Sequence, residues 1–358
     1  MVDFIKYNKL RKKNCPDLYQ DFVKICIKSP VQGESGSESS ARVNTLALDS
    51  DPFILDSDPF ISLWHLTLTP SSTLFVIWLA LTMTLIPVIS LASVSDDLAL
   101  GDQAWSHRAE GHQGSRAAAE PIQKAINAYR KALNAEPENL EARWKLLRAF
   151  HFKGEFVLEV NARRDLFIEG REITKKGILQ IEQEYGFSKN LFRMKPDELA
   201  NAVGKQAVVG EFFFWGSANW GLWGQYSGKL ISALTGVVNK IRLFSETMVL
   251  MDDSIENGGA HRLLGRFNTR VPRIPFITWW VDHDLAISEL RLSLQVAPDS
   301  LLSKIFLAEA LLKFRPAEKV EALGLLQNIV ESTPDPDRLV EDIKVIEDAR
   351  ILLAKKLQ

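Results

Sequence analysis

The feature that most constrains the fold is a set of three residues that occurs three times with the same spacing. An alanine is followed four residues later by a large residue, and eight residues after that by a proline. The copies are Ala125, Tyr129 and Pro137; Ala286, Leu290 and Pro298; and Ala322, Leu326 and Pro334. A spacing of four puts the first two residues on one face of a helix, and proline cannot continue a helix. Each copy therefore predicts a helix that crosses a neighbour at its alanine and ends just before its proline.

This spacing is typical of the second helix of a tetratricopeptide repeat, in which a small residue lies where two helices cross. First-helix positions are also occupied, because Leu307 and Leu311 follow Pro298 in register. From Asp96 onward apolar residues recur every three or four positions, and no stretch alternates convincingly with a period of two. We therefore predict an all-α domain over residues 93–358, built as a tetratricopeptide-like array of helical hairpins (an α–α superhelix). An irregular helical bundle is the alternative.

Residues 74–92 form an apolar segment of nineteen residues without a charge, close to the roughly 20 that span a bilayer. This predicts an N-terminal hydrophobic helix that serves as a signal or transmembrane segment. A buried helix of a soluble protein is the alternative. The chain before it contains a direct duplication, LDSDPFI, at 48–54 and again at 55–61. We expect residues 1–73 to be a poorly ordered extension or the product of a wrongly assigned upstream start. Both interpretations place residues 93–358 beyond a membrane.

The overall composition is that of an ordinary globular protein. The chain has 358 residues and a net charge of −2, with 46% hydrophobic and 25% charged residues. Because there is no basic excess, we expect no nucleic-acid partner. The cysteines, Cys15 and Cys26, lie near the N-terminus, so neither a disulfide nor a cysteine-based metal site is expected after them. We expect no metal and no cofactor.

Catalytic motifs are also missing from the sequence. The histidines form no H-x3-H or H-E-x-x-H pair, and no G-x-S-x-G nucleophile motif occurs. A cysteine nucleophile is absent from residues 93–358. The sequence therefore predicts a protein that binds rather than catalyses, without catalytic residues.

An aromatic and glycine-rich stretch, EFFFWGSANWGLWGQYSG, runs from Glu211 to Gly228. On a helix its apolar residues occupy two sides, which favours a buried central helix of the array. Asn219 lies among them, and its amide needs hydrogen-bond partners, either from the backbone of another helix or from a ligand. In the second case an apolar solute would lie among the aromatic side chains. The candidate residues for that interior are Trp215, Asn219, Trp220 and Trp223.

A glycine pair, Gly258-Gly259, interrupts the helical pattern and is followed by basic residues. Guanidinium groups bind a carboxylate bidentately, so this segment could receive the carboxylate of a ligand. The candidates for this polar end are His261, Arg262 and Arg266. Acidic residues flank the segment and could pair with the same groups; they are Asp252, Asp253, Glu256, Asp282 and Asp284. Structural pairing or partner contact is the favoured interpretation.

Four segments occur in order over about 97–330: GDQAW, WGSANWGLWGQ, NGGAHRLLGRF and AISELRLSLQVAPDSLLSKIFLAEALL. Together they resemble the T component (TatT) of tripartite ATP-independent periplasmic (TRAP) transporters. The resemblance implies a periplasmic helical repeat protein associated with the solute-binding P component of a transporter for organic acids and other small, often hydrophobic, molecules. Members are commonly lipoproteins, whereas no cysteine follows residues 74–92 here. A cleaved signal or an uncleaved membrane helix would replace the lipid anchor.

The functional expectation is a non-catalytic periplasmic accessory or scaffold protein of a TRAP-type transport system. It would bind the periplasmic solute-binding protein, with or without a small hydrophobic or organic-acid ligand, and reach the membrane through residues 74–92. Self-association into a homo-oligomer is left open. The alternative is an envelope tetratricopeptide protein that mediates protein–protein assembly without a small ligand.

Overall fold

The computed structural model describes residues 94–227, 235–274 and 278–357, and every structural statement below concerns these residues. Their regular secondary structure is helical and includes no strand, so the predicted all-α class is confirmed. The predicted extension over 1–73 and the predicted apolar helix over 74–92 lie outside the described residues. Within the described ranges, no helix combines the length and the apolar character that crossing a membrane requires.

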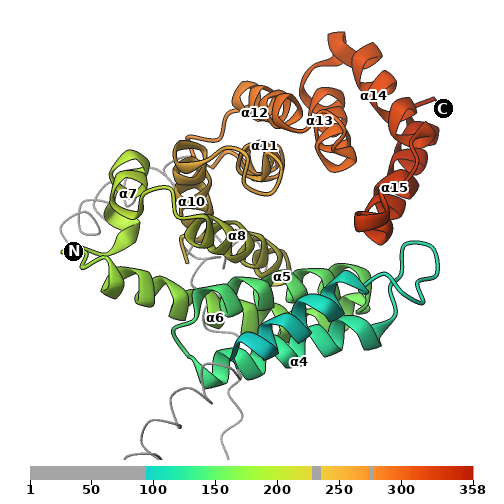
Figure 1. Cartoon of the computed structure of the whole chain (residues 1–358). Helices are drawn as coiled ribbons and strands as arrows, with labels where there is room; N and C mark the ends of the chain where they lie inside the picture. Colours follow the sequence, from blue (N-terminus) through green and yellow to red (C-terminus); the bar gives the residue numbers. More distant parts are fainter. Residues whose placement is uncertain (1–93, 228–234, 275–277, 358) are drawn as a thin grey trace, which may run out of the picture. The chain divides into compact units, whose positions relative to one another are not determined.

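The helices follow one another along the chain with mostly short connections (Figure 1). A helix over 94–106 comes first. The others are α4 (Ala119–Ala135), α5 (Leu140–Phe156), α6 (Arg163–Glu184), α7 (Pro196–Val203), α8 (Ala207–Ser227), α10 (Val237–Met251), α11 (Gly259–Arg270), α12 (His283–Val296), α13 (Leu301–Phe314), α14 (Lys319–Glu331) and α15 (Leu339–Leu357). Most helices pack against the next one in the sequence, and α8 packs against α5, α6 and α10. The aromatic stretch therefore lies on a helix with neighbours on several sides.

The three repeated alanines lie where the spacing predicts. Ala125, Ala286 and Ala322 are all fully buried, and so is the large residue four positions after each of them. Each of the three helices ends two or three residues before its proline; the last helical residues are Ala135, Val296 and Glu331. Helix packing and helix ends thus follow from alanines that permit close approach and prolines that stop the helix.

The start and the end of the described chain are in contact. Nε and Nη2 of Arg108 donate to Glu341 Oε1 at 3.0 and 2.9 Å, and Nη2 also donates to the backbone carbonyl of Asp337. Val340 of α15 is fully buried in an apolar cluster that α4 and α5 provide. Both apolar and ionic contacts therefore join the last helix to the first ones.

The crossing of α11 and α12 leaves no room for a side chain at Gly265. A Cβ at this position would lie 2.4 Å from Leu290 Cγ and 3.0 Å from the carbonyl oxygen of Ala286. Because the two helices would have to move apart, Gly265→Ala is expected to lower the free energy of unfolding by about 1–2 kcal/mol. Urea unfolding followed by circular dichroism measures this change.

Gly324 provides the matched control for this prediction. It lies on α14 and is exposed, and a Cβ there would meet nothing of the described structure within 4 Å. Alanine in a helix interior is preferred over glycine, so Gly324→Ala is expected to raise the free energy of unfolding by about 0.5–1 kcal/mol. A loss of stability in both variants would show that close approach at Gly265 is not the cause.

Candidate functional site

Asn219 is fully buried on α8. Its Nδ2 donates to the backbone carbonyl of Leu147 on α5 at 2.9 Å and to that of Trp215 at 2.8 Å. Gly170 of α6 is close to the same amide, because a Cβ there would lie 2.7 Å from Asn219 Oδ1. The backbone of another helix thus supplies a partner for Asn219 Nδ2, whereas Oδ1 is buried and accepts no hydrogen bond from the described residues.

The three predicted tryptophans do not face one common space. Trp220 is buried and packs against Phe192 and Phe244, with ring centroids 6.0 and 5.9 Å away. The guanidinium carbon of Arg171 lies over Trp223, 4.4 Å from the centroid of the indole ring. Trp215 instead belongs to a polar cluster described below. The chain's own side chains thus surround Trp220, whereas Trp215 has polar neighbours.

His261 and Arg266 contact carboxylates of the helices that follow α11. His261 Nδ1 lies 2.7 Å from Glu289 Oε2 on α12. Arg266 pairs with Glu309 on α13, and its guanidinium lies 3.9 Å from the ring centroid of Phe306. Their partners come from later helices rather than from the acidic residues that flank the glycine pair. Both side chains therefore help to hold α11 against α12 and α13.

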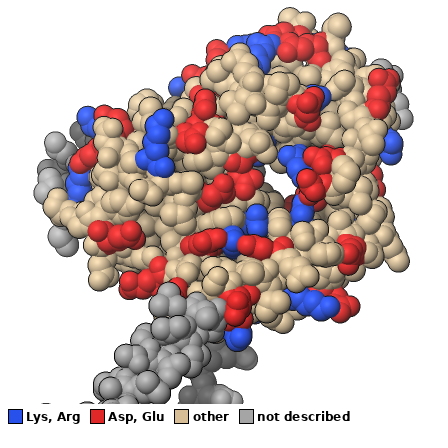
Figure 2. Space-filling view, viewed as in Figure 1, with Lys and Arg blue, Asp and Glu red and all other residues tan. Residues whose placement is uncertain are grey.

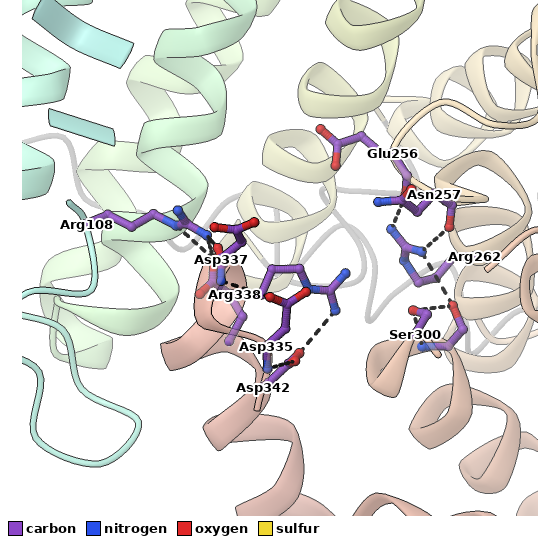
Figure 3. A network of polar contacts seen from close by, with 11 residues as sticks. Arg108, Glu256, Asn257, Arg262, Ser300, Asp335, Asp337, Arg338 and Asp342 are labelled. Carbon is purple, nitrogen blue, oxygen red and sulfur yellow. Dashed lines mark hydrogen bonds and ion pairs between the residues drawn. The ribbon is translucent and has the colours of Figure 1, made fainter. Parts of the chain in front are cut away.

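Arg262 stabilises an unusual turn between α10 and α11. Glu256, Asn257 and Gly258 are all left-handed, with φ of 49°, 53° and 73°. Arg262 Nη2 donates to the backbone carbonyl of Glu256 at 2.9 Å, and Nη1 donates to that of Asn257 at 3.1 Å (Figure 3). Burial lowers the pKa of Arg262 to about 10, so the side chain stays charged at neutral pH. The buried guanidinium thus compensates a backbone conformation that L-residues rarely adopt.

This turn places Glu256 beside Glu211 of α8. Trp215 Nε1 donates to Glu256 Oε1 at 2.9 Å. Burial, the charge of Glu256 and hydrogen bonding to it together raise the pKa of the Glu211 carboxyl to about 8, against the opposing influence of Arg148 and Trp215. Glu211 Oε2 is buried and has no hydrogen-bond partner among the described residues. Glu211 therefore holds its proton at neutral pH.

Arg148 and His151 of α5 form the other side of this cluster. The Arg148 guanidinium lies over two indoles, 4.1 Å from the ring centroid of Trp105 and 4.9 Å from that of Trp144. In the part of the chain that the structure describes, no carboxylate forms an ion pair with Arg148, and its Nε is buried without a partner. The His151 ring packs edge-on against Trp215, with centroids 5.5 Å apart. Burial lowers the pKa of His151, so the imidazole is neutral at pH 7.

We name these five residues the Glu211–Glu256 site: Glu211, Glu256, Trp215, Arg148 and His151. The site offers one guanidinium, the proton of Glu211, a second carboxyl, a neutral imidazole and several indole faces. Such groups can bind a small polar molecule in a fixed orientation. Within the described ranges, no group of three or more His, Cys, Asp or Glu residues is placed to hold a metal ion. On the face seen in Figure 2, acidic and basic side chains border a hollow.

Two of the predicted site residues, Trp215 and Arg262, donate hydrogen bonds to the same residue, Glu256. Sequence reasoning identified Glu256 only as a flanking acid, and it missed Glu211, Arg148 and His151. One signal was present for Glu211, because it is the only charged residue of α8. A lone carboxylate in a buried aromatic helix needs a partner, and that need points to a polar site.

Comparisons with known proteins add no relative. No protein-family model matches the chain, and no curated protein matches it. The case for a function therefore depends on the sequence patterns and on the geometry of the Glu211–Glu256 site.

Proposed function

We propose that this chain is an exported, non-catalytic binding protein of the TRAP T-component type. It would hold a periplasmic solute-binding protein on a tetratricopeptide-like array and take up a small organic acid at the Glu211–Glu256 site. The array is supported by the buried alanines at the helix crossings and by the packing of most helices against their successors in the sequence. Proteins built in this way use an extended helical surface to bind a partner.

The observation that carries the ligand part of the proposal is the state of the charges in the site. Arg148 forms no ion pair with a carboxylate among the described residues. The pKa of Glu211 is raised to about 8, so its carboxyl is protonated at neutral pH. Both side chains are partly buried, which costs free energy, and such arrangements are concentrated at functional sites. A carboxylate ligand would receive two N–H groups from Arg148 and a hydrogen bond from the protonated Glu211. Its apolar part would lie against the indoles of Trp105 and Trp215.

The test is native mass spectrometry of the full chain, which should retain a small acidic molecule that Arg148→Met loses. Removing a charge-assisted pair at a desolvated site is expected to weaken binding about tenfold or more. Arg171→Met is the matched control, because it also removes a guanidinium from an indole face, that of Trp223. Equal retention by both variants would contradict the proposal. Conversion of the bound molecule into a product would contradict its non-catalytic part.

The second candidate is an envelope assembly protein without a small ligand. It is favoured by the packing around Asn219 and Trp220, which are buried among the chain's own groups. Capture experiments with purified full chain and envelope extract separate the two candidates. Under the first candidate we expect recovery of a periplasmic solute receptor. Under the second we expect unrelated envelope proteins, and a native mass spectrum without a bound small molecule.

A further inference from the structure

We propose that a groove lined by residues between 135 and 209 binds a basic, partly aliphatic segment of the partner, the proposed solute-binding protein. The groove has a volume of about 770 Å³. It lies between the α4–α5 turn, the end of α6 and the start of α8; its lining residues include Glu136, Glu138, Leu140, Glu141, Gln180, Glu184, Tyr185, Val208 and Val209. This inference specifies the chemistry of the partner, and so it rests on the proposed partner-binding role.

The charges that line the groove are of one sign. Four glutamates line it and no lysine or arginine does. Glu141 is neutralised by Lys145, whose Nζ lies 2.6 Å from its Oε1. Glu138 and Glu184 are exposed, and neither forms an ion pair with any residue in the described ranges. Glu138 also interacts with the charge of Arg143, so Glu184 is the less compensated of these two carboxylates, and a cationic partner would be attracted to them.

The groove is also lined by apolar side chains. Leu140 and Val209 are almost completely buried, and Val208 and Tyr185 are half-buried. Burial, followed by the nearby charge of Glu184, raises the pKa of the Tyr185 phenol, which therefore remains a neutral hydrogen-bond donor. An aliphatic side chain that lies on this surface would be removed from water.

These two features together fit a polypeptide segment that carries cationic and aliphatic side chains. Two separate carboxylates call for two cations, and the apolar lining calls for a hydrocarbon group. The charge attraction would steer the partner and would weaken as salt concentration rises.

The test uses a fluorescent hexapeptide of alternating lysine and leucine, titrated with the full chain and followed by fluorescence anisotropy. The wild type is expected to bind it about tenfold more tightly than a glutamate–leucine or a lysine–glycine hexapeptide. The double variant Glu138→Lys/Glu184→Lys is expected to lose about tenfold in affinity. The milder Glu138→Gln/Glu184→Gln should lose about threefold, which keeps the test valid if charge reversal disturbs folding.

A control with the same change of net charge is Asp299→Lys/Glu331→Lys. Both residues are exposed and lie outside the groove, before α13 and at the end of α14. This control is expected to change the affinity by less than about twofold. An equal loss in both lysine double variants would overturn the inference, as would equal affinity for all three peptides. Self-association that Glu138→Lys/Glu184→Lys abolishes would also overturn it, because the occupant would then be a second copy of this chain.

The outcomes also separate this inference from the proposed function. Peptide binding at the groove without receptor capture or ligand retention would leave the inference standing and contradict the proposed function. Receptor capture that Glu138→Lys/Glu184→Lys leaves unchanged would support the proposed function and overturn the inference.

Discussion

The Arg262→Met variant is expected to lose about 3 kcal/mol of unfolding free energy, because methionine fills the space but donates no hydrogen bond. The carbonyls of Glu256 and Asn257 would then lose their charge-assisted partners. Both residues are also left-handed, which costs non-glycine residues roughly 1–2 kcal/mol each and depends on these hydrogen bonds for compensation. Urea unfolding at neutral pH measures the loss.

Arg266→Met is the matched control on the same helix. Arg266 is about a quarter exposed, and its partner Glu309 keeps a second ion pair, with Arg270 Nη2 at 2.9 Å. The expected loss is therefore below about 1 kcal/mol, as for other ion pairs near the surface. If both variants lost the same free energy, support of the left-handed turn would not be the role of Arg262.

The Arg262→Met variant should also change the chemistry of the site. A loosened turn would let Glu256 move away from Glu211, and the charge of Glu256 is one cause of the raised pKa of Glu211. We expect the pKa of Glu211 to fall toward its ordinary value, which side-chain carbon NMR as a function of pH can follow. Folding stability and the proton of the site would thus depend on one buried arginine.

The helical part of the fold could be predicted because its signals are local. Ala125, Ala286 and Ala322 each lie four residues before a large side chain and twelve before a proline, and these positions determine a helix face and a helix end. Such spacings do not depend on distant parts of the chain. The structure accordingly has buried alanines and helices that end where expected.

The site could be predicted only in part, because its partners come from distant segments. The Nδ2 of Asn219 donates to the carbonyl of Leu147, on a different helix, and periodicity does not show which carbonyl will lie there. Arg262 has the right chemistry for a ligand carboxylate, yet its donors go to the backbone just before its own helix. Glu211 was visible only as a charge in an apolar helix, and its partner Glu256 is brought close by a left-handed turn.

The second large effect concerns pH. Between the ordinary carboxyl pKa of 4.5 and a pKa of about 8, the folded chain holds a proton on Glu211 that the unfolded chain has released. Stability from this proton is therefore complete below 4.5, falls as the pH rises and is lost above 8. A difference of this size corresponds to at most about 5 kcal/mol. The partial exposure of Glu211 and its coupling to Glu256 reduce the expected effect to about 2–3 kcal/mol.

Glu211→Gln removes this titration and keeps the shape of the protonated side chain. The variant is expected to match the wild type near pH 4 and to be about 2–3 kcal/mol more stable at pH 9. The difference between the two pH profiles isolates Glu211, because all other titrating groups are common to both proteins. The control is Glu331→Gln, at an exposed position on α14. The difference between its unfolding free energy and that of the wild type should not change with pH. A flat difference for Glu211→Gln as well would mean that Glu211 is not protonated in the folded chain at neutral pH, and the ligand proposal would lose its hydrogen-bond donor.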